Sequence, residues 1–149
     1  MKSEPFQPDS WTCNTAQYYG LDTDTGAFTV YNSSEDKRQS FNKRFGVKGK
    51  ANCPTPFTAA CYVGFFGQKT DYPNYNVIET DYVNYSVVYT CEFEKEKPYL
   101  WFLCREPVCA DEWIEIMMGV AQENLVYFDY DDLISDVQGD KCNYKALPE

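Results

Sequence analysis

The sequence has no histidine, and none of its seven cysteines forms a Cys-x-x-Cys pair. Histidines and closely spaced cysteines are the usual ligands of zinc and haem, so the chain lacks the usual set for either metal centre. A histidine is also the usual base that activates a catalytic thiol, and a catalytic cysteine would have no such partner here. We therefore expect no metal site, no required cofactor and no enzymatic activity.

Long apolar runs and positive charge are also scarce. No segment approaches the run of about 20 apolar residues that spans a membrane. The chain has 23 acidic and 13 basic residues and a net charge of −10, which disfavours nucleic acid and anionic membranes as partners. One segment departs from this by holding six of the basic residues: Lys37, Arg38, Lys43, Arg44, Lys48 and Lys50. We interpret it as a solvated strand and loop, with a site for an anionic partner as the alternative.

The chain shows no signal peptide, because Met1 leads directly into the polar segment Lys2-Ser3-Glu4-Pro5. Cysteines at loop-rich spacings are nevertheless typical of an oxidising compartment. We therefore expect a secreted, extracellular protein, seen in its mature or trimmed form or without its start. An odd number of cysteines leaves at least one thiol free or bonded between chains.

Aromatic residues are abundant, at 17% of the chain. Together with short alternating segments between turn signals, they favour an antiparallel barrel. The length of 149 residues indicates one domain, 1–149. Its predicted parts are an extended arm over 1–12, strands over 13–21, 27–33, 41–50, 58–67, 75–80, 84–94 and 99–105, a helix over 110–123, a final strand over 125–130, and an acidic tail over 131–149.

The predicted helix carries an apolar face at i, i+3, i+4 and i+7: Trp113, Ile116, Met117 and Val120. Asp111 is its expected N-cap. A helix that follows seven strands and has one apolar face must pack against the sheet. The sequence thus favours an all-β antiparallel barrel, closed by one packed C-terminal α-helix, over a sandwich.

The stretch over residues 75–91, YNVIETDYVNYSVVYTC, closely resembles the second signature of the lipocalin family. Within that family it is most similar to the branch of the crustacyanins, apolipoprotein D and the insect bilin-binding proteins. Arg105-Glu106-Pro107 is similar to the third signature. Phe6-Gln7-Pro8 with Cys13 is similar to the segment after the first strand, and Gly139-Asp140-Lys141-Cys142 is similar to the branch's C-terminal cysteine. The resemblance implies an all-β, antiparallel up-and-down lipocalin barrel (calyx) with one C-terminal α-helix packed outside.

The first lipocalin signature, Gly-x-Trp, is missing. Trp11 is not its tryptophan, because it lies beside Cys13 in the following segment. The resemblance implies that Arg105 loses the tryptophan across which it packs, and that the barrel is short of its first strand. Strand edges would then be unpaired unless residues 1–10 cover them.

The resemblance implies a disulfide from Cys13 to the C-terminal cysteine. It also implies that the usual partner of Cys91, upstream of the missing tryptophan, is absent, so that Cys91 is free or captured by another cysteine. Two further cysteines flank a proline-rich turn and are placed for a local bridge. The predicted pairings are Cys13–Cys142, Cys53–Cys61, and Cys91 with either Cys104 or Cys109.

Alternation predicts which side chains line the calyx. In 84–94 we expect the aromatic face to point inward, because the reverse would expose it to water. Trp101, Tyr18 and Asn32 also match pocket positions of apolipoprotein D. The predicted ligand-binding residues are Tyr18, Phe28, Val30, Asn32, Tyr75, Val77, Tyr85, Val87, Tyr89, Trp101 and Leu103. The alternative is that these side chains fill a solid core.

Asn84-Tyr85-Ser86 and Asn32-Ser33-Ser34 are N-glycosylation sequons. Asn84 is predicted to carry a glycan on the outer face. Asn32 would serve either as a glycosylation site or as a pocket residue, and we favour the pocket.

The predicted function is binding, transport or sequestration of a small hydrophobic ligand, such as a carotenoid, bilin, retinoid, sterol or fatty acid. We expect the bound molecule to be a chromophore or a lipid. The alternative is a subunit of a homo- or hetero-oligomer, as in pigment–protein complexes. An enzyme would have only cysteine or acidic groups to use, and Asp129, Asp131 and Asp132 are interpreted as a solvated tail.

Overall fold

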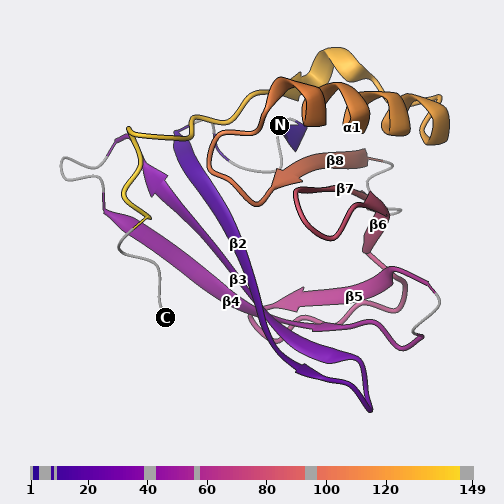
Figure 1. The fold of residues 1–149 in the computed structure, drawn as a ribbon. Coiled ribbons are helices and arrows are strands. Elements are labelled where there is room, and N and C mark those ends of the chain that lie inside the picture. Colours follow the sequence, from indigo (N-terminus) through magenta and orange to yellow (C-terminus); the bar gives the residue numbers. More distant parts are fainter. Residues whose placement is uncertain are drawn as a thin grey trace.

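A computed structural model describes residues 2–3, 8, 10–38, 43–55, 58–92 and 97–144, with residues 2–3, 91–92 and 97 described by their backbone alone. Within these residues a sheet has the strand order β2-β3-β4-β5-β6-β7-β8-β1-β9, and every pair is antiparallel. The sheet curls into a half-barrel, and one helix lies outside it across β7 and β8 (Figure 1).

The strands are β1 (Lys2–Ser3), β2 (Trp11–Asp22), β3 (Ala27–Asp36), β4 (Arg44–Asn52), β5 (Ala60–Phe65), β6 (Tyr75–Thr80), β7 (Tyr85–Glu92), β8 (Lys97–Cys104) and β9 (Leu133–Ile134). The helix α1 spans Asp111–Asn124, and a 3₁₀ turn spans Tyr130–Asp132.

Seven predicted strands correspond to β2 through β8, and β6 has the predicted bounds. Residues 41–42 and 93–94 of two predicted strands lie outside the described residues. β3 runs on to Asp36, past its predicted end at Ser33. The added residues are polar but buried: Ser34 and Glu35 pair with β4, and Asp36 pairs with Trp11 of β2. The C-terminal segment contacts Glu35 through Asn143.

The N-terminal arm contributes to the sheet. Lys2 pairs with Trp101 of β8 and with Ile134 of β9, and Ser3 pairs with Leu133. The described part of the arm therefore includes a short strand, which joins β8 to β9 in the sheet.

The predicted strand over 125–130 is wrong. Residues 125–129 turn away from α1, with Phe128 buried in the core and Tyr127 exposed. The carboxylate of Asp129 accepts the N–H of Asp131 at 3.1 Å and begins the 3₁₀ turn. The alternation of apolar residues was real, but it reflects a turn with one inward side chain. The actual strand is β9. The described part of the tail after it, residues 135–144, packs against β2 instead of extending into solvent.

The helix packs on the sheet through Met117 and Ala121, which are buried against β7 and β8. Trp113 and Val120 join this core as predicted, whereas Ile116 is 42% exposed. Asp111 is the first helical residue and not the N-cap, which is Ala110. With Glu112, its negative charge still favours the positive end of the helix dipole.

Candidate ligand-binding site

The strand register assigns the side chains of the sheet to two faces. Directly paired residues of antiparallel strands point to the same face. Val87 and Phe102 are a pair, and both pack with Met117 of α1, so their face is the outer one. Val88 and Trp101 are the next pair along the same strands. Because successive side chains alternate, Val88 and Trp101 point to the concave side of the half-barrel.

Three predicted ligand-binding residues lie on the outer face, which corrects the prediction. Val87 is fully buried in the core with α1, and Tyr85 and Tyr89 pack against the same core. Tyr85 stacks on Trp113 with ring centroids 5.8 Å apart, and its hydroxyl donates to Glu79 Oε1 at 2.9 Å. The helix, and not the calyx, shields these aromatic side chains from water.

The other predicted residues lie on the concave face. Tyr18 pairs with Val30, Val77 pairs with Val88, and their neighbours follow by alternation. The concave set from the prediction is Tyr18, Phe28, Val30, Asn32, Tyr75, Val77, Trp101 and Leu103. Their role in binding a ligand stays a prediction.

The predicted ligand-binding residues did not include Val88 and Thr90, which are buried on the concave face. A signal was present: the apolar face of the helix requires an apolar sheet face outside the barrel. A strand with side chains buried on both faces, such as β7, is therefore expected beneath α1.

Tyr18 and Tyr75 meet on the concave side of the sheet, where their hydroxyl groups form a hydrogen bond of 2.8 Å. Burial is the main cause that raises the pKa of both phenols. Tyr18 is nevertheless 43% exposed. A side chain that is surrounded by protein and still open to solvent lies on a concave surface. The ring of Phe28 packs edge-on against Tyr18 at 6.1 Å and extends this aromatic wall.

β7 and β8 form another part of the concave face. Tyr99 and Trp101 stack with centroids 6.1 Å apart. Thr90 pairs with Tyr99, and its buried hydroxyl oxygen has no hydrogen-bond partner. A buried hydroxyl without a partner costs about 1–3 kcal/mol. The concave face thus combines flat apolar rings with a few hydroxyl groups, which suits a hydrophobic molecule with polar ends.

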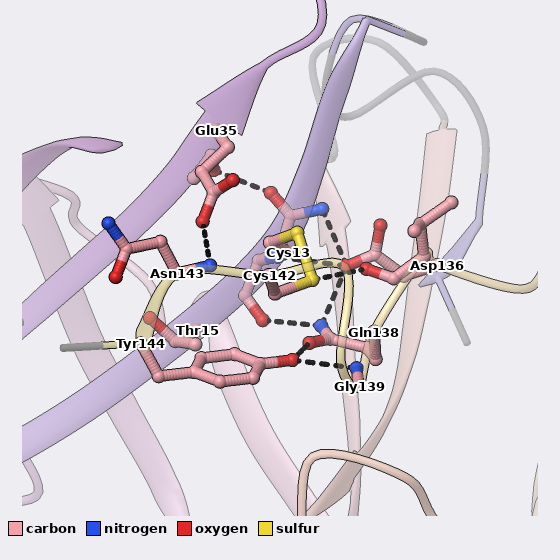
Figure 2. The surroundings of a disulfide bond; sticks show 12 residues. Cys13, Thr15, Glu35, Asp136, Gln138, Gly139, Cys142, Asn143 and Tyr144 are labelled. Atoms are coloured by element: carbon pink, nitrogen blue, oxygen red, sulfur yellow. Dashed lines mark hydrogen bonds between the residues drawn. A yellow bond between two sulfur atoms is a disulfide. The ribbon is translucent and has the colours of Figure 1, made fainter. Parts of the chain in front are cut away.

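The C-terminal segment is fastened to β2 and β3 beside this face. Figure 2 shows the disulfide between Cys13 and Cys142 and the hydrogen bonds around it. Asp136 accepts the backbone and side-chain N–H groups of Asn14 at 3.0 and 2.8 Å. Gln138 donates to the carbonyl oxygen of Asn14 at 2.8 Å. These contacts fix one end of β2, the edge strand of the sheet.

A buried ion pair completes the attachment. Arg44 donates to Glu35 Oε1 at 3.2 Å, and the two side chains are 2% and 5% exposed. The guanidinium also donates to Ser33 Oγ at 2.9 Å and to the carbonyl oxygen of Asn143 at 3.0 Å. Glu35 accepts the N–H of Asn143 at 2.6 Å. Arg44, part of the basic segment, is therefore a structural residue and not a solvated one.

Three disulfides are present: Cys13–Cys142, Cys53–Cys61 and Cys104–Cys109. The first two are the predicted pairings. The predicted bond from Cys91 to Cys104 or Cys109 is wrong, because these two are bonded to each other across the short loop between β8 and α1. The side chain of Cys91 lies outside the described residues.

Solved structures share this architecture, although no protein-family model matches the chain and no curated protein matches it. Lobster apocrustacyanin A1 superposes with a TM-score of 0.75 at 17% identity, over 97% of this chain and 76% of that one. Apocrustacyanin C2 gives 0.75 at 18%, over the same shares. The chain has the lipocalin fold. The cockroach allergen Per a 4 is a more distant match, with a TM-score of 0.61 at 19% identity, over 88% of this chain and 76% of that one.

The stretch that resembles the second lipocalin signature forms the turn between β6 and β7. Asp81 Oδ1 accepts the N–H groups of Val83, Asn84 and Tyr85 at 3.0, 2.7 and 3.0 Å. Burial alone would raise the pKa of Asp81, but these hydrogen bonds, with one from the Asn84 amide, lower it to about 2. The carboxylate therefore holds the turn in its charged form.

The two sequons differ in their surroundings. Asn84 lies in this turn, half-buried, with its amide donating to Asp81 Oδ2 at 2.6 Å, and it stays a predicted glycosylation site. Asn32 lies on the concave face within β3, paired on both sides, and the following Ser33 and Ser34 are buried. This position fits a pocket residue better than a glycan.

Arg105, from the stretch that resembles the third lipocalin signature, is exposed, and its N–H donates to the carbonyl oxygen of Asn84 at 2.8 Å. Among the described residues its guanidinium makes no ion pair and no contact with an aromatic ring face.

The described residues contain no group of three or more cysteine or carboxylate side chains that could hold a metal ion. None of their helices is long and apolar enough to cross a membrane.

Proposed function

We propose that the protein binds a small hydrophobic ligand against the concave face of its lipocalin sheet and carries or sequesters it without chemical change. The observation that supports this most is the hydrogen bond between Tyr18 and Tyr75 on the concave side of the sheet. The Tyr18 side chain is surrounded by protein there and is still accessible to solvent. At about 25 cal/mol per Å², burial of a long apolar ligand supplies micromolar binding or better.

Intrinsic fluorescence tests this proposal, because two tryptophans lie on opposite faces of the sheet. Trp101 faces the hollow and Trp113 lies on α1 against Tyr85. Retinol, a carotenoid, a bilin and a fatty acid should each be titrated into the wild type, Trp101→Phe and Trp113→Phe. We expect saturable quenching in the wild type and in Trp113→Phe, and loss of most of it in Trp101→Phe. Equal quenching in both variants, or none with any ligand, contradicts the proposal.

A pigment is the more specific proposal for the ligand. The resemblance of residues 75–91 to the crustacyanin branch supports a carotenoid or bilin. The stacked rings of Tyr99 and Trp101 also offer flat surfaces to a conjugated chain. Absorbance of the protein purified from its natural source tests this. A coloured protein that bleaches on solvent extraction is expected, and a colourless one overturns it.

A secreted setting and oligomer formation complete the proposal. Three disulfides support an oxidising compartment. The edge strand β2 carries exposed Tyr19 and Leu21, which favours contact with a second subunit. Size-exclusion chromatography with and without reductant checks this. A monomer under both conditions, at all concentrations, excludes the oligomer.

A further inference from the structure

A groove of about 270 Å³ lies on the outer side of the sheet, away from α1. Its lining includes Tyr19, Thr29, Lys48, Lys50 and Phe66. Tyr19, Thr29 and Lys50 alternate with residues that face the hollow, so the groove and the hollow occupy opposite faces of the same strands. The groove is therefore separate from the ligand site proposed above.

The register explains the shape of the groove. Tyr19 pairs with Thr29, Thr29 with Lys50, and Lys50 with Gly64, so the four residues form one row across four strands. Neighbouring strands are about 4.8 Å apart, which makes the row about 14 Å long. The middle of the row is low, because Thr29 is short and Lys50 Nζ bends to donate to Thr29 Oγ1 at 3.3 Å.

The far wall of the groove is the turn after β5. This turn folds back over Gly64, where a Cβ atom would collide with the carbonyl oxygen of Gln68. The N–H of Gln68 donates to the carbonyl oxygen of Phe65 at 3.0 Å. Phe66 has a φ of +55°, which is strained for a bulky residue, and its side chain is 86% exposed. Strained backbone that holds out an aromatic ring is typical of a functional site.

The charge of the groove is opposite to that of the whole molecule. Lys48 and Lys50 are exposed, and the sequence from Lys37 to Thr70 contains no aspartate or glutamate. The protein as a whole carries a net charge of −10. At physiological salt, charges more than about 8 Å away are largely screened. None of the residues that line the groove is acidic, so the lining offers an anion two ammonium groups and no carboxylate.

We propose that this groove binds an anionic group carried on a flat ring, either an acidic sugar or an aromatic acid. The carboxylate or sulfate pairs with Lys48 and Lys50, and the ring lies between Tyr19 and Phe66. Aromatic side chains contact sugar and aryl faces equally well, so both sources share the same recognition chemistry.

The test is a titration of the ¹⁵N-labelled protein, followed by amide shifts, with naphthalene-2-sulfonate, glucuronate, inorganic sulfate and the neutral naphthalene-2-methanol. Lys48→Gln/Lys50→Gln removes the charge of the groove. Lys37→Gln/Lys43→Gln removes the same charge from exposed lysines outside it. Phe66→Ala removes the ring.

We expect a ring-borne anion to shift amides of residues 19, 29, 48–50 and 64–68. The groove variant should weaken its binding at least tenfold, the control variant less than twofold, and Phe66→Ala at least threefold. The tighter of naphthalene-2-sulfonate and glucuronate identifies the source. Binding of sulfate as tight as that of the ring anions, shifts confined to concave residues, equal binding by both lysine variants, or no binding at about 10 mM each overturns the proposal.

Discussion

Tyr18 and Tyr75 are 57 residues apart in the sequence, and their hydroxyl groups lie 2.8 Å apart. They belong to β2 and β6, which are separated by three other strands in the sheet. A hydrogen bond between such distant strands requires the sheet to curl toward its own concave side. The pair therefore both reports the curvature and supplies hydroxyl groups where a ligand is proposed to lie.

Replacement of Tyr75 by phenylalanine should remove this hydrogen bond and lower the free energy of unfolding by about 1 kcal/mol. Burial raises the pKa of Tyr75 above the ordinary value of 10.0. A raised pKa contributes stability that is complete below pH 10 and falls as the pH rises further, because the unfolded chain then loses a proton that the folded chain keeps. Urea unfolding from pH 8 to 11 should show a shallower alkaline loss in Tyr75→Phe. Identical slopes in both proteins contradict this account.

Asp81 should stabilise the protein in the opposite pH range. Its pKa is lowered from 3.8 to about 2, so its contribution is complete above about pH 4 and is lost as the pH falls toward 2. Asp81→Ala should lower the unfolding midpoint at pH 7, and the difference from the wild type should shrink below pH 3. Asp24→Ala, in the turn between β2 and β3, is the control for removal of an exposed acid. A difference that stays constant with pH would show that the charge of Asp81 has no role.

The disulfides Cys13–Cys142 and Cys53–Cys61 should differ in their contribution to stability. In the chain-entropy model, a loop with a sequence separation of 129 gives about 5 kcal/mol, and one with a separation of 8 gives about 2.6 kcal/mol. Cys13→Ser/Cys142→Ser should therefore be less stable than Cys53→Ser/Cys61→Ser in guanidinium unfolding. The reverse order would mean that the C-terminal attachment is weaker than its hydrogen bonds indicate.

The buried pair of Glu35 and Arg44 should show strong coupling. Arg44→Met leaves the Glu35 carboxylate buried without its partner and should cost about 3–5 kcal/mol. Glu35→Gln/Arg44→Met removes both charges and should be more stable than Arg44→Met alone. A double-mutant cycle in urea measures the coupling energy, and strictly additive effects would contradict the described network.

The order and kind of the main elements were predictable from local pattern, because alternation and turn residues act over a few positions. The strand β6, with Tyr75 and Thr80 at its ends, and the helix that buries Met117 illustrate this. Which side-chain face of β7 points to the concave side of the sheet was not predictable in the same way. Tyr85 and Val88 lie on opposite faces of one strand, and both faces are covered, one by α1 and one by the curl of the sheet.

Features that depend on distant segments escaped the sequence. The strand β9 has two residues, and its pairing with Ser3 gives no periodic signal. The bond between Cys104 and Cys109 depends on the path of a short loop that composition does not specify. The burial of Glu35 depends on the C-terminal segment that folds back over it, 108 residues later, at Asn143.

The most direct measurement of ligand binding compares two adjacent valines. Val87 and Val88 are both 0% exposed, but Val87 faces α1 and Val88 faces the concave side of the sheet. In a protein labelled at its valine methyl groups and saturated with the ligand that quenches Trp101, nuclear Overhauser contacts to the ligand are expected from Val88 and Val30 and not from Val87. Contacts from Val87, or from neither residue of this adjacent pair, would contradict the account.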